Sequence, residues 1–122
     1  MDTQLLGRYG EERTADYLRR RGYKILALNY RTRFGEVDVI ASRGGYIAFV
    51  EVKLRKNAVF AQAREFVTAQ KQRRVILAAE SYLQSCPTEL QPRFDVAEVY
   101  APEGFATRRP RIRYWENAFT LD

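Results

Sequence analysis

The sequence contains no histidine among its 122 residues. This absence excludes general-base catalysis by imidazole, catalytic triads built on histidine and the usual zinc sites. Any catalysis must therefore depend on carboxylates, lysine, tyrosine or a hard metal ion bound by oxygen. The single cysteine, Cys86, cannot form a disulfide within the chain, and such scarcity is typical of a reducing compartment.

Long apolar runs are also absent. No stretch approaches the roughly 20 consecutive apolar residues that a membrane-spanning helix needs. The first residues, MDTQLLGRYG, contain no apolar segment of the kind found in a signal peptide. We therefore expect a soluble, cytoplasmic protein.

The length favours one domain, 1–122, with a single modest core, and is too short for two. Hydrophobic residues make up 46% of the chain, which is enough for a packed globule. Lysine and arginine total 21 against 15 aspartate and glutamate residues, so the net charge is +6. This excess favours a polyanionic partner such as nucleic acid, although it is also compatible with ordinary solubility.

Hydrophobic periodicity and turn residues predict the order helix, three strands, helix, two strands. The expected helices cover 3–21, ended by Gly22, and 68–85, capped by Thr68. The expected strands cover 23–30, 34–41, 46–54, 93–100 and 111–119, with loops at 55–66 and 101–110. The third-to-fourth connection is long enough for a parallel crossover, so we predict an α/β fold with a central five-stranded mixed sheet flanked by helices.

Four charged residues lie inside two expected strands, where a core would favour valine or isoleucine: Glu36, Asp38, Glu51 and Lys53. A two-residue turn at 44–45 would set Asp38 opposite Glu51, with Cβ atoms about 5 Å apart. The same register would pair Arg43 with Tyr46 and Ile40 with Phe49. A slip of one residue would break this arrangement.

Two carboxylates held so close repel each other unless a positive charge lies between them. Lys53 is one candidate, and a hard divalent cation, Mg²⁺ or Mn²⁺, is the other. The alternative is an exposed cross-strand salt bridge, worth about 0–1 kcal/mol. Ile40, Ile47 and Phe49 are expected on the same face, and such apolar side chains indicate that this face is not exposed to solvent.

Two helical residues point to the same place. Glu11 lies on the inward stripe of the first helix, beside Gly7 and Gly10, whose missing side chains would let the backbone approach a neighbour. A carboxylate at this inward position is expected to be either a metal ligand or a partner of an arginine in an internal salt bridge. Lys71 lies on the buried stripe of the second helix. We expect its side chain either to contact a phosphate, together with Gln70, or to extend its ammonium group from the apolar stripe into water.

The stretches GRYGEERTADYL, GYKILALNYR, GEVDVIA, FVEVKLR, TAQKQRR and RFDV occur in this order over nearly the whole chain. Together they resemble the YraN-type family of small uncharacterised bacterial proteins. By similarity, that family belongs to the PD-(D/E)XK nuclease superfamily and looks most like archaeal Holliday-junction resolvases. The resemblance implies the restriction-endonuclease-like, or resolvase-like, version of the α/β fold.

The resemblance also implies roles for individual residues. The metal-binding aspartate of the superfamily would be Asp38, its (D/E)-x-K motif would be Glu51 and Lys53, and the resolvase-like helix glutamate would be Glu11. Glu36 belongs to the Gly-Glu-x-Asp pattern, and Gln70 and Lys71 match the helix that follows. Three positions depart from the pattern: Val37 replaces proline, and Leu54 and Ala61 stand where many relatives carry threonine and glycine.

Basic residues flank the expected site. Arg31 and Arg33 precede it, and Arg55 and Lys56 follow it, so a phosphate backbone passing Asp38 would meet them. Further basic clusters are scattered along the chain, at 19–21, 73–74 and 108–113. A solvated surface is the alternative for all of them, and it is the better explanation for 19–21 at a helix end.

These patterns predict an Mg²⁺- or Mn²⁺-dependent endonuclease that hydrolyses DNA phosphodiester bonds, with branched or flapped DNA among its expected substrates. Asp38, Glu51 and Lys53 would be catalytic, and Glu11 and Glu36 would assist the two acids in holding metal. The alternatives are a catalytically inactive nucleic-acid-binding protein on the same scaffold and an adaptor with no affinity for nucleic acid. Resolvase-like enzymes often form dimers that cut two strands, so a homodimer is one of the assemblies that the resemblance allows.

Overall fold

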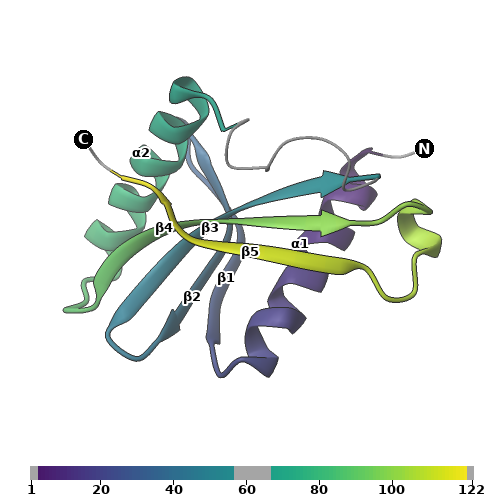
Figure 1. The fold of residues 1–122 in the computed structure, drawn as a ribbon. Coiled ribbons are helices and arrows are strands. Elements are labelled where there is room, and N and C mark those ends of the chain that lie inside the picture. The colour runs from purple at the N-terminus through teal and green to yellow at the C-terminus, as the bar shows by residue number, and fades with distance from the viewer. Residues whose placement is uncertain (1–2, 57–66, 121–122) are drawn as a thin grey trace.

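The computed structural model describes residues 3–56 and 67–120. These residues form an α/β fold in which one mixed sheet, with strand order β1-β2-β3-β4-β5, lies between two helices (Figure 1). The strands are β1 (Lys24–Arg31), β2 (Glu36–Arg43), β3 (Tyr46–Arg55), β4 (Gln91–Tyr100) and β5 (Arg111–Phe119). The helices are α1 (Thr3–Arg20) and α2 (Ala69–Ser85), and a 3₁₀ turn, η2 (Gly104–Ala106), precedes β5. The architecture agrees with the predicted five-stranded mixed sheet and is consistent with a resolvase-like fold.

The helix ends follow from local chemistry. Gly22 adopts a φ of 86° after α1, and the N–H groups of Gly22 and Tyr23 donate to the carbonyls of Arg19 and Leu18. This is the hydrogen-bond pattern that a glycine with positive φ permits at a helix C-terminus. At the start of α2, the Thr68 hydroxyl accepts from the N–H of Lys71, which confirms the predicted cap.

The β2–β3 hairpin has the predicted register. Arg43 pairs with Tyr46 and Ile40 with Phe49, around a turn in which Gly44 has a φ of 57°. β3 then pairs with β4 in parallel, and the other neighbouring strands pair antiparallel. The connection through α2 is therefore the predicted crossover, and β1 and β5 form the two edges of the sheet.

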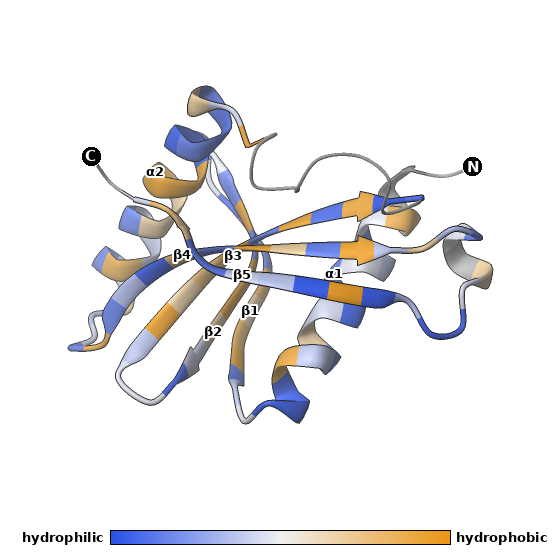
Figure 2. Ribbon diagram, viewed as in Figure 1, coloured by the Kyte–Doolittle hydropathy of each residue, from blue (hydrophilic) through white to orange (hydrophobic). Residues whose placement is uncertain are grey.

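Alternation along the strands builds a core on each face of the sheet. On one face, Ile40, Ile47, Phe49 and Phe94 of the strands pack with Val75 and Ala78 of α2. On the other face, Val39, Ala41, Ala48, Val50 and Ala97 pack with Leu18 of α1. Figure 2 shows hydrophobic residues along the strands and hydrophilic residues at the start of α2 and the end of α1. None of the described helices is long and apolar enough to span a bilayer.

The two glycines of α1 differ in their surroundings. Gly10 lies close to β3, since a Cβ at this position would meet Leu54 and Val52 at 3.3 Å. A Cβ at Gly7 would meet no atom of the described residues within 4 Å. The predicted close approach is therefore confirmed at Gly10 and wrong at Gly7.

The loop expected at 55–66 lies largely outside the described residues. β3 continues through Arg55, and the description resumes at Val67. Ala61, one of the three departures from the family pattern, also lies outside the described residues.

Candidate functional site

The candidate site begins where the pairing of β2 and β3 stops. The paired residues run from Arg43 and Tyr46 to Val39 and Val50, and Asp38 and Glu51 are the next residues on the two strands. One carboxylate oxygen of Asp38, Oδ2, accepts a hydrogen bond of 2.8 Å from the backbone N–H of Val52. The Asp38 side chain thus takes a donor on β3 just beyond the end of the ladder, which fixes this carboxylate next to Glu51.

Glu51 is buried in an environment that disfavours its charge. Its relative exposure is 4%, and burial raises its pKa from 4.5 to about 8. The charge of Asp38 and a hydrogen bond between the two carboxyl groups also raise the pKa, while the nearby charges of Lys71 and Lys53 lower it. The two acids therefore lie against each other, and the alternative of an exposed salt bridge on a wet sheet face does not hold.

Lys71 reaches this pair from α2. Its Nζ lies 3.6 Å from Oε2 of Glu51, and its side chain keeps 35% of its surface exposed. A Cβ on Gly35 would lie 1.9 Å from the carbonyl oxygen of Arg74, so only a glycine lets α2 approach the start of β2 this closely. Arg74 is about one helical turn after Lys71. The glycine of the GEVD stretch therefore helps to place Lys71 against Glu51.

Glu11 approaches the site from α1. Burial and then the charge of Asp38 raise its pKa from 4.5 to about 7, with Glu36 acting in the same direction and Arg31 opposing it. The packing of Gly10 against β3 brings this part of the helix to the sheet. Glu11 thus lies within the field of Asp38. Its predicted role as a metal ligand stays a prediction.

Lys53 continues β3 beyond Glu51, and its charge lowers the pKa of Glu51. Beside it on β4 lies Glu98, which is 1% exposed and accepts hydrogen bonds from the Tyr100 hydroxyl at 2.7 Å and the Trp115 indole at 3.0 Å. Sequence reasoning missed Glu98, although it shows the same signal as Glu51, a carboxylate within an apolar strand.

The other predicted nucleic-acid contacts are spread around this centre. Arg31 is paired with Glu36, with 3.4 Å between Nε and Oε2, while its side chain is 62% exposed. Nε of Arg55 lies 4.0 Å from Glu98. Arg33 lies over the ring of Phe34, and the side chains of Gln70 and Lys56 are exposed. The structure therefore brings together Asp38, Glu51 and Lys71. Glu11 and Lys53 lie close enough to interact electrostatically with this group. Of the remaining predicted residues, Arg31 pairs with Glu36 and Arg55 with Glu98.

A second carboxylate that sequence reasoning missed has a structural role. Asp95, on β4, is fully buried and accepts hydrogen bonds from Nε and Nη2 of Arg93, the Tyr114 hydroxyl and the N–H of Asn117. Arg93 in turn donates to the Tyr23 hydroxyl. These contacts join β4 and β5 to the start of β1. They leave Asp95 satisfied, which distinguishes it from the pair of Asp38 and Glu51.

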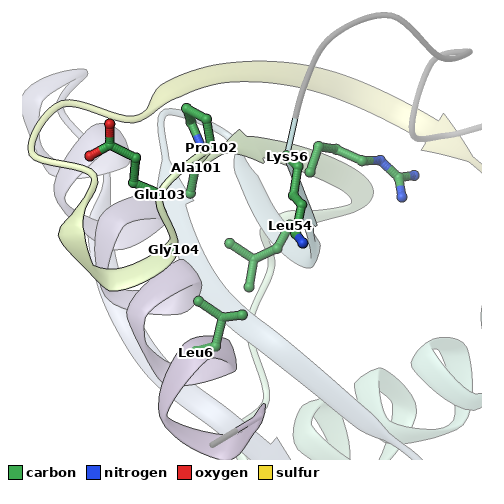
Figure 3. A pocket seen from close by; sticks show the side chains of 8 residues that line it. Leu6, Leu54, Lys56, Ala101, Pro102, Glu103 and Gly104 are labelled. Carbon is green, nitrogen blue, oxygen red and sulfur yellow. The ribbon is translucent and has the colours of Figure 1, made fainter. Parts of the chain in front are cut away.

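A cavity of about 550 Å³ opens at the carboxyl ends of β3 and β4 (Figure 3). It is lined by Leu6 of α1, by Leu54, Arg55 and Lys56, and by residues 101–104 on the far side. Figure 3 shows the Leu6 and Leu54 side chains side by side, with Glu103 across from them. The cavity borders the stretch that follows Lys53, but its lining includes neither Asp38 nor Glu51.

The donor set of the site suits a hard divalent cation. Two carboxyl groups lie against each other with a raised pKa at Glu51, which is the arrangement that a cation between them would relieve. Mg²⁺ commonly binds through one or two carboxylates and keeps several waters. Among residues 3–56 and 67–120, no three aspartate, glutamate or cysteine side chains form a ready-made metal cluster.

Comparison with known proteins identifies relatives along nearly the whole chain. The model of the uncharacterised protein family UPF0102 matches residues 10–99. A UPF0102 protein of Symbiobacterium thermophilum is 45% identical over 116 residues, covering 93% of this chain and 95% of its own. A UPF0102 protein of Syntrophotalea carbinolica is 47% identical over 118 residues, covering 96% of this chain and 93% of its own. These matches confirm the resemblance to the YraN-type family, and the chain belongs to the uncharacterised protein family UPF0102.

Proposed function

We propose that this protein is a metal-dependent nuclease that hydrolyses phosphodiester bonds in DNA, with branched or flapped DNA as its preferred substrates. The observation that carries the proposal is the pair of Asp38 and Glu51, which lies against Lys71 and in the field of Lys53. A fold stabilised by burial alone would not need two facing carboxyl groups at this position, because each costs free energy unless it is paired.

In the proposed arrangement, Asp38 and Glu51 hold Mg²⁺ or Mn²⁺. The ion would supply a Lewis acid for the phosphate oxygens and a bound water with a lowered pKa. Asp38 is oriented by the Val52 N–H, and Glu51 by the Lys71 ammonium. Lys53 contributes positive charge beside the negative charge that develops on the phosphorus-centred transition state.

Substrate recognition follows from the surrounding charges. Lys71 keeps a third of its side-chain surface exposed while it contacts Glu51, so it can meet a phosphate at the edge of the site. Arg31, Arg33, Arg55, Lys56 and Gln70 would supply further polar, mostly positive contacts. Contacts of this kind bind the backbone and carry no base sequence, which fits selection by DNA structure.

The test is cleavage of a panel of labelled duplex, flapped and four-way-junction DNA with Mg²⁺, Mn²⁺ or EDTA. Asp38→Asn should keep the fold, because the amide oxygen of the new side chain can still accept from the Val52 N–H, and should lose activity by about 100-fold or more. Lys53→Ala should lose activity to a similar degree. Asp16→Asn, the same chemical change at an exposed position of α1, should cleave like the wild type.

Two results would defeat the proposal. Cleavage that survives both Asp38→Asn and Lys53→Ala would show that the activity comes from a contaminant. Salt-sensitive DNA binding by the wild type without cleavage of any substrate under any metal would favour a binding protein on a nuclease scaffold.

A further inference from the structure

A separate cavity of about 300 Å³ lies between α1 and the chain that leads into β5. Four of its six lining residues are arginines: Arg13 and Arg20 of α1, and Arg108 and Arg109 from the chain before β5. Pro110 and Ile112 complete its wall. We refer to this cavity as the arginine pocket. None of the residues assigned to the candidate metal site lines it.

The arginine pocket is built by the fold. Arg13 and Arg20 are about two turns apart, so they lie on the same side of α1. The Tyr9 hydroxyl, also on α1, donates to the carbonyl of Thr107, the residue before Arg108, at 2.8 Å. The Thr107 hydroxyl accepts from the N–H of Glu103 at 3.0 Å. These bonds hold the segment that carries Arg108 and Arg109 against the helix.

In the part of the chain that the structure describes, no carboxylate forms an ion pair with an arginine of the pocket. Arg13 lies over the ring of Tyr9, which leaves its charge in place. Arg19 differs from them, since it pairs with Asp16 at 3.0 Å. The helix dipole acts within the last turn, so it accounts for a cation at Arg20 but not for one at Arg13.

We infer that the arginine pocket binds a backbone phosphate of the nucleic acid, distinct from the phosphate that is cleaved; the inference rests on the proposed function. Four guanidinium groups around one cavity repel each other, and an anion between them relieves this repulsion. The planar, forked guanidinium matches the oxygens of a phosphate, which a lysine does less well.

The arginine pocket and the candidate metal site lie on different sides of α1, so the proposal requires two phosphates, one at each place. Glu11 and Arg13 are separated by about 200° around α1. Glu11 faces the Asp38 side of the helix and Arg13 faces the arginine pocket. A nucleic acid that meets both places must therefore pass around α1, with one phosphate on each flank of the helix. This requirement favours a duplex or a branched substrate over a short single strand.

The test compares variants from which the same number of charges is removed. Arg108→Gln with Arg109→Gln neutralises one wall of the pocket, and Arg13→Gln with Arg20→Gln neutralises the other. Arg19→Gln with Lys24→Gln is the matched control, because both residues are exposed and neither lines the pocket. Circular dichroism and thermal melting establish that each variant folds.

Binding of a fluorescein-labelled duplex is measured in EDTA over a range of salt concentrations, so that cleavage does not enter. Each pocket variant should reduce the magnitude of the negative slope of log K against log salt by about 1 for each phosphate that it no longer binds. The control should keep the wild-type slope. An equal decrease in the control, or no decrease in either pocket variant, would overturn the inference.

A second arm separates the backbone from a free anion. Pyrophosphate is titrated into the wild type while the arginine side-chain N–H signals are followed by NMR. Pyrophosphate binding at Arg108 and Arg109 with an unchanged duplex slope in the variants would overturn the nucleic-acid source. A reduced slope in a protein that cleaves no DNA would refute the proposed function alone, and normal cleavage with unchanged slopes would refute this inference alone.

Discussion

Replacing Glu51 by glutamine removes an ionisable group that the fold holds in an unfavourable environment. Burial and the neighbouring Asp38 raise the pKa of Glu51 from 4.5 to about 8. Because each pH unit of displacement corresponds to about 1.4 kcal/mol, ionising Glu51 costs the folded protein at most about 5 kcal/mol. Glutamine keeps the shape of the side chain without this cost, and Lys71, which is 35% exposed, can turn its ammonium group into water.

The sign of the effect follows from proton binding. The folded protein keeps the Glu51 proton up to about pH 8, while the unfolded chain releases it near 4.5. Between these values the folded state binds more protons, so its free energy of unfolding falls as the pH rises. Glu11, with a pKa raised to about 7, acts in the same direction. The Glu51→Gln variant should lose the larger part of this dependence.

The measurement is urea unfolding at low ionic strength in EDTA, at about pH 5.5, 7 and 8.5. At the lowest pH, which lies one unit above the unfolded-state pKa of 4.5, we expect Glu51→Gln to be more stable than the wild type by only about 1 kcal/mol. At the highest pH, the variant should be more stable by a few kcal/mol. Glu80→Gln, the same change at an exposed position of α2, is the control and should follow the wild type.

Adding Mg²⁺ at the highest pH should stabilise the wild type and not the variant, because an ion that binds the folded state raises its stability. A wild-type stability that is flat or rises over this pH range would refute the reasoning. So would a Glu51→Gln variant with the wild-type slope.

Further substitutions test the packing and capping of the helices and strands by urea unfolding. Gly35→Ala would place a Cβ 1.9 Å from the Arg74 carbonyl oxygen and should cost about 3 kcal/mol or more. Gly7→Ala, where a Cβ would meet no described atom within 4 Å, should stabilise α1 by about 0.5–1 kcal/mol. Equal effects of the two substitutions would contradict the close approach of α2. Thr68→Ala removes the cap of α2 and should cost about 1 kcal/mol, with Thr68→Ser retaining it. Tyr114→Phe removes one donor from the buried Asp95 and should cost about 1–3 kcal/mol, and a neutral result would show that the remaining donors suffice.

The hairpin that carries the two acids could be predicted from the sequence because its determinants are local. The turn at Gly44 and Gly45 sets the register, and alternation along the strands then decides which residues face each other. The pairing of Ile40 with Phe49 confirms this reasoning.

The contacts between distant elements could not be predicted in the same way. The ion pair between Lys71 and Glu51 depends on where α2 lies on the sheet, which no periodicity encodes. The contact of Gly35 with Arg74 depends on it too. The prediction of a close approach at Gly7 is wrong for a related reason, because composition alone cannot distinguish the two glycines of α1.

Asp95 and Glu98 show a further limit of sequence reasoning. Both lie in an apolar strand and carry the same signal as Asp38 and Glu51. What separates the two groups is their partners, because Asp95 and Glu98 are surrounded by donors from β4 and β5. A carboxylate in a strand therefore marks a position worth examining, and the surrounding donors decide whether it is structural.

The hydrogen bond from the Val52 N–H to Asp38 fixes the orientation of this carboxylate relative to the backbone of β3. An acid oriented by the main chain does not need its ligand in order to adopt its conformation. The entropy of ordering it is lost when the protein folds and not when an ion arrives. The main chain thus sets the position of Asp38 in advance, so binding of the proposed ion should leave the arrangement of the strands unchanged.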